Sequence, residues 1–170
     1  MAICQGFLYN LYVKFTIEPK IFQTFPDAII GLVGFQAIEN KQEIPEITTQ
    51  LRAEEGNLPQ RLGGLLIEHP HISSWREAYR KFGAKPKDYP SSIENLVRRV
   101  LKGSPVPNIN ALVDIYNSVS LRYLVPVGGE DSDKIAGDVH LTFASESESP
   151  VKLLGEPEMR PPKQIGRAHV

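Results

Sequence analysis

Residues 92 to 102 constrain the fold of this chain more than any other segment, because the two sides of this stretch differ in character. The apolar residues recur at a spacing that places them on one side of an α-helix, and they are Ile93, Leu96, Val97, Val100 and Leu101. Ser91 and Glu94 form a capping-box arrangement at the start, and Gly103 supplies the stop. Such a helix must bury its apolar side against other elements, so the chain needs a packed core.

The remaining pattern predicts three further helices and four strands. Helices are expected at residues 46–55, closed by Gly56 and Asn57, from Ser73 or Ser74 to Phe82, and from Ile109 to Val119. The last of these should bury Ile109, Leu112, Val113, Tyr116 and Val119. Strands are expected at residues 13–17, 28–38, 121–127 and 139–144, with turns at Pro26–Asp27 and Gly128–Gly129. This order predicts an α+β fold in which mixed sheets pack against helices.

Composition narrows the class of protein. With 41% apolar and 23% charged residues, the 170-residue chain has the ordinary mixture of one globular domain. A formal charge of -1 offers no general attraction to a polyanion, so DNA is not an expected partner. Cys4 is the single cysteine, which excludes an internal disulfide and favours a reducing, cytoplasmic compartment. Charge or proline breaks every apolar run, so no membrane partner is expected.

The two ends of the chain differ from its middle. Residues 1–12 are apolar but lack a cationic start, and we interpret them as a leader or an edge strand. The stretch after Ser145 is polar, contains prolines and has no periodicity. The sequence therefore predicts a domain over residues 13–150 and a disordered or foreign tail over residues 151–170.

Charge is distributed unevenly along the chain. Residues 75–102 hold eight Lys or Arg against three acidic residues, whereas residues 129–149 hold six acidic residues against one lysine. The basic segment at residues 75–102 could bind the phosphates of a single-stranded RNA end. The candidate RNA-binding residues are Arg76, Arg80, Lys81, Arg98, Arg99 and Lys102. The alternative is that these cations simply form the solvated faces of two helices.

Known catalytic and metal-binding patterns are missing from the sequence. The four histidines have neither the helical spacing nor the cysteine neighbours of a metal site. Asp131 and Asp133 could hold a cation, but acidic residues beside a Gly-Gly turn more often form a solvated loop. Neither the G-x-S-x-G motif of hydrolases nor the glycine-rich nucleotide-binding motifs G-x-x-x-x-G-K and G-x-G-x-x-G occur. We therefore predict no metal and no cofactor, and no catalytic residue can be assigned.

The segment HPHISSWREAYRKFGAKPKDYPSSIENLVRRVLKG, together with PNINALVDIYNSVSLRYLVPVGGEDSDKIAGDVHLTFA, resembles free-standing B3/B4 domain proteins. The related module of the phenylalanyl-tRNA synthetase β subunit hydrolyses mischarged Tyr-tRNA(Phe), so the resemblance implies a pocket for the aminoacylated 3' end of a tRNA or for a free amino acid. That module reads as an I-N-x-x-V-D-x-x-N helix, a proline-led turn and a D-x-D-K-like stretch. The substrate-binding candidates that this implies are Asn110, Asp114, Asn117, Pro126, Gly128 and Gly129.

Two features depart from the pattern of that family. Gly128 stands where the synthetase turn carries a histidine implicated in editing. The resemblance also stops near Gly155, so the domain looks truncated at its C-terminal end, and an unpaired strand edge is expected near residues 139–144. Three functions follow as hypotheses: a trans-acting aminoacyl-tRNA editing hydrolase, a noncatalytic module that binds tRNA or an amino acid, and a protein-interaction domain.

Overall fold

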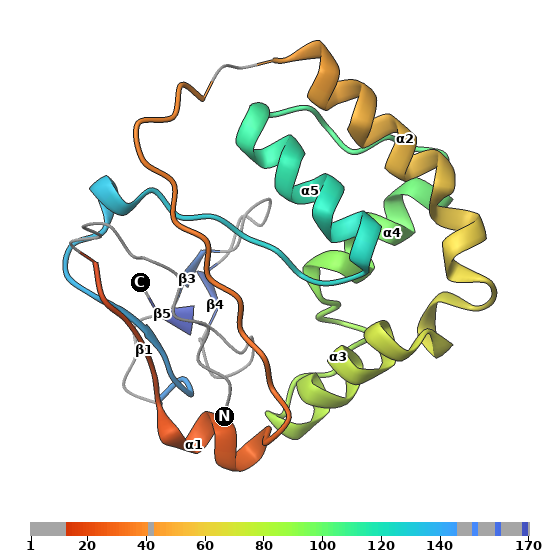
Figure 1. Cartoon of the computed structure of the whole chain (residues 1–170). Helices are drawn as coiled ribbons and strands as arrows, with labels where there is room; N and C mark the ends of the chain where they lie inside the picture. Colours follow the sequence, from red (N-terminus) through yellow and green to blue (C-terminus); the bar gives the residue numbers. More distant parts are fainter. Residues whose placement is uncertain (1–12, 41–42, 146–150, 153–158, 161–167, 170) are drawn as a thin grey trace. The chain divides into compact units, whose positions relative to one another are not determined.

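The computed structural model describes residues 13–40 and 43–145, and the backbone of three short strands at residues 151–152, 159–160 and 168–169. The chain divides into two compact units (Figure 1). One comprises Glu39–Gly129, and the other comprises Met1–Ile38 with Glu130–Val170. The predicted leader and most of the predicted tail lie outside the described residues. Their assignment, like the domain boundaries, stays a prediction.

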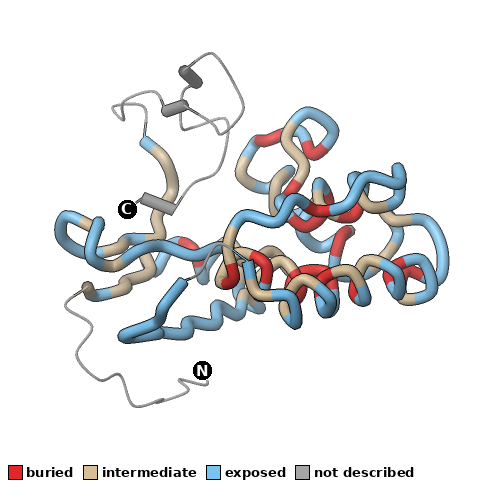
Figure 2. The backbone as a smooth tube through the Cα atoms, turned by 90° about the horizontal axis from the view of Figure 1, so that it is seen from above, coloured by how far each residue is buried: buried red, intermediate tan, exposed pale blue. Residues whose placement is uncertain are grey.

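The first unit is built from helices. In chain order they are α2 (Pro45–Leu62), the 3-10 turn η1 (Leu66–Glu68), α3 (Pro70–Lys81), α4 (Ser92–Leu101) and α5 (Ala111–Tyr123). α2 runs alongside α5 and also packs on α4 (Figure 1). The buried core consists of Leu51, Leu58, Leu62, Ile72, Ile93, Val97, Val106, Leu121 and Leu124. In Figure 2 the buried positions recur at intervals in the helical unit, with exposed positions between them, as amphipathic packing requires.

α2 is longer than the sequence suggested. It does not close at Gly56 but continues to Leu62, and Gly63 ends it with a left-handed φ of 62°. Leu58 and Leu62 lie on the side that faces the core, and their burial outweighs the helix-weakening effect of Gly56 and of Pro59 in the last turn. The prediction that Gly56 and Asn57 close this helix is therefore wrong.

The predicted helices around the basic segment are confirmed, with changes at their ends. α4 matches the expected bounds within one residue, although Leu101 is 48% exposed rather than buried. α3 begins at Pro70, several residues earlier than expected, because proline suits the first helical position and His69 caps it. The His69 ring nitrogen Nδ1 accepts from the backbone N–H of His71 at 3.3 Å.

α5 covers most of the helix predicted at residues 109–119 and extends into the segment predicted as a strand at residues 121–127. Residues 121–123 are helical, and Leu124 terminates the helix in a left-handed conformation with φ 53°. The buried side of α5 is not the predicted apolar stripe, since Ile109 and Val119 are exposed. The buried residues are Ala111, Asp114, Ser118, Ser120 and Leu121. Small and polar side chains face the core here because α2 packs closely on this side of α5.

The second unit contains small sheets. β1 (Phe15–Ile17) leads into α1 (Pro19–Thr24), and β2 (Val139–Leu141) follows the 3-10 turn η2 (Ser132–Lys134). β1 and β2 are parallel, with Phe15 opposite Val139, and β5 (Ala168–His169) pairs antiparallel with β2 on its other side. β3 (Val151–Lys152) pairs antiparallel with β4 (Met159–Arg160). Because β2 has a neighbour on both sides, the prediction of an unpaired edge near residues 139–144 is wrong.

The segment at residues 28–38 is not the predicted strand. It forms no strand and lies exposed, with Ile29 at 95% and Val33 at 77% exposure. A β-rich sequence forms a strand only where a neighbouring strand accepts its backbone hydrogen bonds, and none of the described strands pairs with this segment. The fold class itself, α+β with helices and mixed sheets, is confirmed.

Candidate nucleic-acid interface

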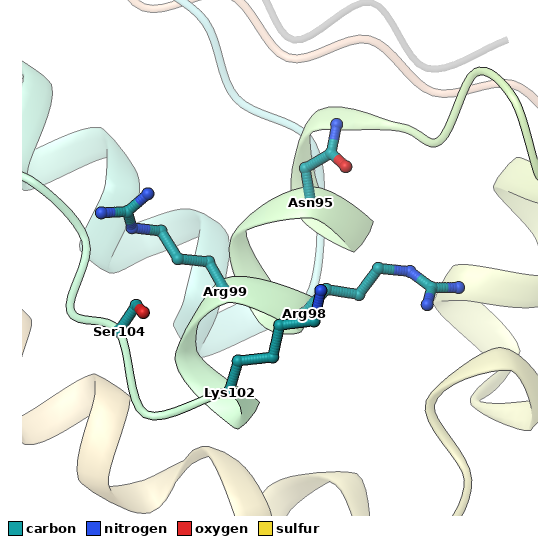
Figure 3. A pocket seen from close by; sticks show the side chains of 5 residues that line it. All are labelled: Asn95, Arg98, Arg99, Lys102 and Ser104. Atoms are coloured by element: carbon teal, nitrogen blue, oxygen red, sulfur yellow. The ribbon is translucent and has the colours of Figure 1, made fainter.

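The C-terminal half of α4 carries a shallow basic hollow of about 320 Å³ (Figure 3). The residues that line it are Asn95, Arg98, Arg99, Lys102 and Ser104. The two arginine side chains extend to different sides of the helix, and Lys102 follows one turn after Arg98. Cations in the last turn of a helix are favoured there by the negative end of the helix dipole. The hollow thus concentrates three positive charges at the surface.

Arg98 is anchored from within the fold. Its Nε and Nη2 atoms both donate to Oε1 of Glu94, at 3.0 and 2.6 Å. Nη1 is not used in this ion pair, and the side chain remains 46% exposed. Arg98 therefore holds a fixed orientation while one end of its guanidinium faces solvent.

Arg99 is anchored in the same way but to the backbone. Its Nε donates to the carbonyl oxygen of Pro105 at 2.7 Å, a hydrogen bond that does not use the two terminal nitrogens. Lys102 differs from both arginines, because its ammonium group has no hydrogen-bond or ion-pair partner within the described part of the chain. A guanidinium whose orientation is already fixed loses less conformational freedom when it binds an anion.

Glu94 is the buried centre that organises this region. Its side chain is inaccessible to solvent, and Oε1 also accepts from Nη1 of Arg76 at 2.7 Å. The backbone N–H of Glu94 donates to the Ser91 hydroxyl at 3.4 Å, so only one half of the predicted capping box forms. Burial, and secondarily the negative charge of Glu94, raises the pKa of Tyr79. Oε2 of Glu94 is buried and has no hydrogen-bond partner among the residues that the structure describes.

The six predicted RNA-binding residues are therefore not equivalent. Arg98, Arg99 and Lys102 line one hollow. Arg76 is only 17% exposed and is occupied by Glu94. The remaining two, Arg80 and Lys81, are exposed in the last turn of α3 and do not line the hollow.

The predicted substrate-binding residues lie on α5 and the loop after it. Asn110 is the N-cap of α5 and accepts from the backbone N–H of Val113 at 2.9 Å. Asp114 is buried, with Oδ2 accepting from Asn108 at 2.7 Å and Oδ1 accepting from the Ile109 N–H at 3.3 Å. These two side chains thus hold the start of the helix in place.

The remaining candidates follow further along the chain. Asn117 and Pro126 are half-buried, whereas Gly128 and Gly129 are exposed. A Cβ added to Gly129 would meet the ring of Tyr116 at 3.5 Å, which is ordinary contact. None of the six predicted substrate-binding residues lines the basic hollow.

A second shallow hollow, which the sequence did not predict, adjoins the first. It measures about 300 Å³ and is lined by Arg52, Glu55, Gly56, Val100, Gly103, Ser104 and Pro105. Ser104 lines both hollows. Gly56 is the sequence signal that could have predicted this hollow, because a glycine on the exposed side of a helix leaves space where a side chain would ordinarily lie.

No group of three potential metal ligands occurs among the residues that the structure describes. His69 and His71 come close, with ring centroids 5.4 Å apart. Burial, and then the charge of His71, lowers the pKa of His69. Within the described residues, no helix is long and apolar enough to cross a membrane.

The fold and the interface define an α+β domain with a basic helix end. The family model of the B3/4 domain matches residues 74–165, which is more than half of the chain and includes α4 and α5. The chain therefore belongs to the B3/4 domain family, whose known context is the phenylalanyl-tRNA synthetase β subunit. The match continues past Gly155, where we expected the resemblance to stop. Comparisons with curated proteins and with solved structures gave no match.

Proposed function

We propose that this protein is a tRNA-binding B3/4 module that holds RNA phosphates at the basic hollow of α4. The observation that carries the proposal is the cluster of Arg98, Arg99 and Lys102, which lies inside the family match. Oriented guanidinium groups and a mobile ammonium group are the donors that bind phosphate oxygens best. A local cluster of this kind can attract RNA although the chain as a whole carries a charge of only -1.

The reaction that such binding would serve is trans-acting editing of an aminoacyl-tRNA. Water would attack the ester carbonyl, the bond between the acyl carbon and the tRNA oxygen would break, and a free amino acid and a 3' hydroxyl would form. An aminoacyl ester is already activated, so positioning of the ester and stabilisation of the oxyanion are physically sufficient. The family membership supports this part of the proposal.

The second candidate is a noncatalytic module that binds tRNA or an amino acid. Gly128 favours it, because this exposed glycine has no side chain to act as an acid or a base. The two candidates share the binding step and differ only in turnover, so one protein preparation can distinguish them.

The decisive experiment is a filter-binding titration of tRNA at about 50 and 200 mM salt, beside a deacylation time course with correctly and incorrectly charged tRNAs. We would test the variant Arg99→Glu/Lys102→Glu, since reversing Arg98 would place an acid against the buried Glu94. Each lost phosphate contact should reduce the slope of the logarithm of the binding constant against the logarithm of the salt concentration by about 0.7 for single-stranded RNA.

The matched control is Lys85→Glu/Lys87→Glu, which makes the same charge change at exposed linker positions outside the hollow. Unchanged RNA affinity in the α4 variant would contradict the proposal and would favour a protein-interaction domain. Hydrolysis of one mischarged species would establish editing, and salt-dependent binding without hydrolysis would establish the noncatalytic module.

A further inference from the structure

The two hollows that meet at Ser104 have complementary chemistry. The α4 hollow carries Arg98, Arg99 and Lys102, whereas the other hollow has mainly uncharged walls from Gly56, Val100 and Pro105, among others. We propose that together they bind one nucleotide, with its phosphate in the α4 hollow and its base in the second hollow. This inference rests on the proposed function, and it names the part of the RNA that is recognised.

The second hollow suits an uncharged ring rather than an anion. Arg52 Nη1 lies 2.6 and 2.7 Å from the two carboxylate oxygens of Glu55, so the charges of this wall cancel. Arg52 Nη2 is also occupied, since it donates to the Val106 carbonyl oxygen at 2.7 Å and to Asn108. A phosphate would therefore gain little here and should prefer the α4 hollow.

The glycines leave room for a flat ligand. A Cβ added at Gly56 or at Gly103 would meet nothing within 4 Å, so the space above both positions is open. The two hollows measure about 320 and 300 Å³. Both volumes lie near the lower limit of roughly 300 Å³ for small-molecule pockets, so the pair suits one nucleotide rather than a larger ligand.

The segment between the hollows is held from both sides. From α4, the Arg99 carbonyl oxygen accepts from the Ser104 N–H at 3.2 Å, and Arg99 Nε donates to the Pro105 carbonyl oxygen. From α2, Glu55 Oε1 accepts from the Val106 N–H at 2.6 Å. A shared wall that is already ordered lowers the entropy cost of binding. The position of this shared wall would set the distance between the bound phosphate and the bound base.

The test measures the affinities of inorganic phosphate, adenosine monophosphate and a short single-stranded RNA, by calorimetry, for the full chain and its variants. Gly56→Leu fills the second hollow at a helical position where leucine is well tolerated. We expect it to weaken adenosine monophosphate binding by about tenfold, which corresponds to about 1.4 kcal/mol, while phosphate binding is unchanged. Asn57→Leu, the next exposed residue of α2 and outside both hollows, should change neither affinity.

The variant Arg99→Ala/Lys102→Ala provides the other arm, because it should weaken the binding of phosphate and nucleotide alike. Equal affinity of the wild type for phosphate and for adenosine monophosphate would overturn the inference, and so would unchanged nucleotide affinity in Gly56→Leu. Either result leaves the proposed function standing if tRNA binding still depends on Arg99 and Lys102. Tighter binding of the RNA than of the mononucleotide would identify a strand end as the ligand, and the reverse order would identify a free nucleotide.

Discussion

Replacing Glu94 with glutamine should destabilise the helical unit, because it removes the negative charge from the centre of a buried cluster. The substitution keeps the size of the side chain and one carbonyl acceptor. A hydrogen bond to a charged group contributes about 1.5–3 kcal/mol to stability. The hydrogen bond from Arg76 should contribute nearly this full amount, because the Arg76 side chain is only 17% exposed. Arg98 is 46% exposed, so solvent screening reduces its contribution to less than about 1 kcal/mol. The free energy of unfolding should therefore fall by about 1.5–4 kcal/mol.

Urea denaturation followed by the fluorescence of Trp75, the one tryptophan of the chain, measures this loss next to the cluster. Glu77→Gln is the matched control, since Glu77 is 65% exposed and pairs at the surface with Lys81 at 3.5 Å; it should change stability by less than about 0.5 kcal/mol. A double-mutant cycle with Arg76→Met should reveal coupling of about 1 kcal/mol or more. If Glu94→Gln costs no more than the control, the buried ion pair does not stabilise this unit.

Three further results are expected. Leu121→Ala, at a position with no solvent exposure, should lower the free energy of unfolding by about 2–5 kcal/mol in the same urea titration. The folded-state pKa of His69 lies below its ordinary 6.5, so the unfolded chain binds more protons just below that pH, and the free energy of unfolding should decrease as the pH is lowered there. His69→Ser keeps a cap acceptor but does not titrate, so this variant should flatten the decrease. Val33→Lys with Phe35→Lys should raise the concentration at which light scattering detects aggregation, without changing the urea midpoint, because both side chains are exposed.

Each of these expectations has an opposing outcome. A loss below about 1 kcal/mol for Leu121→Ala would mean that the packing of α5 is loose. An unchanged pH profile in His69→Ser would assign the decline to other groups. A lower urea midpoint in the double lysine variant would show that residues 28–38 are covered in the folded protein.

Local signals in the sequence were sufficient for α4. Its bounds, its Ser91 cap and the stop at Gly103 all depend on residues within one or two turns of one another, and the structure confirms them. β1 and the turn at Pro26–Asp27 were predicted for the same reason.

Signals that depend on distant partners were misleading. Gly56 and Pro59 suggested an early end of α2, but the burial of Leu58 extends the helix. Residues 121–123 suggested a strand, yet Leu121 is buried in the helical core. In both cases packing against a segment far along the chain decided the conformation, which local propensity cannot reveal.

The amino-acid sequence by itself determined the family, through its resemblance to B3/B4 domain proteins. It also determined the α+β class and the concentration of positive charge around α4, because these follow from local pattern and composition. The tertiary structure decided what each charged residue does. Arg76 and Glu94 are far apart in sequence but form a buried pair, and Arg99 is tied to Pro105 across a loop. The partner of a charged side chain is set by the packing of helices. Only the folded chain therefore separates Lys102, whose ammonium group has no partner among the described residues, from the arginines that are held in place.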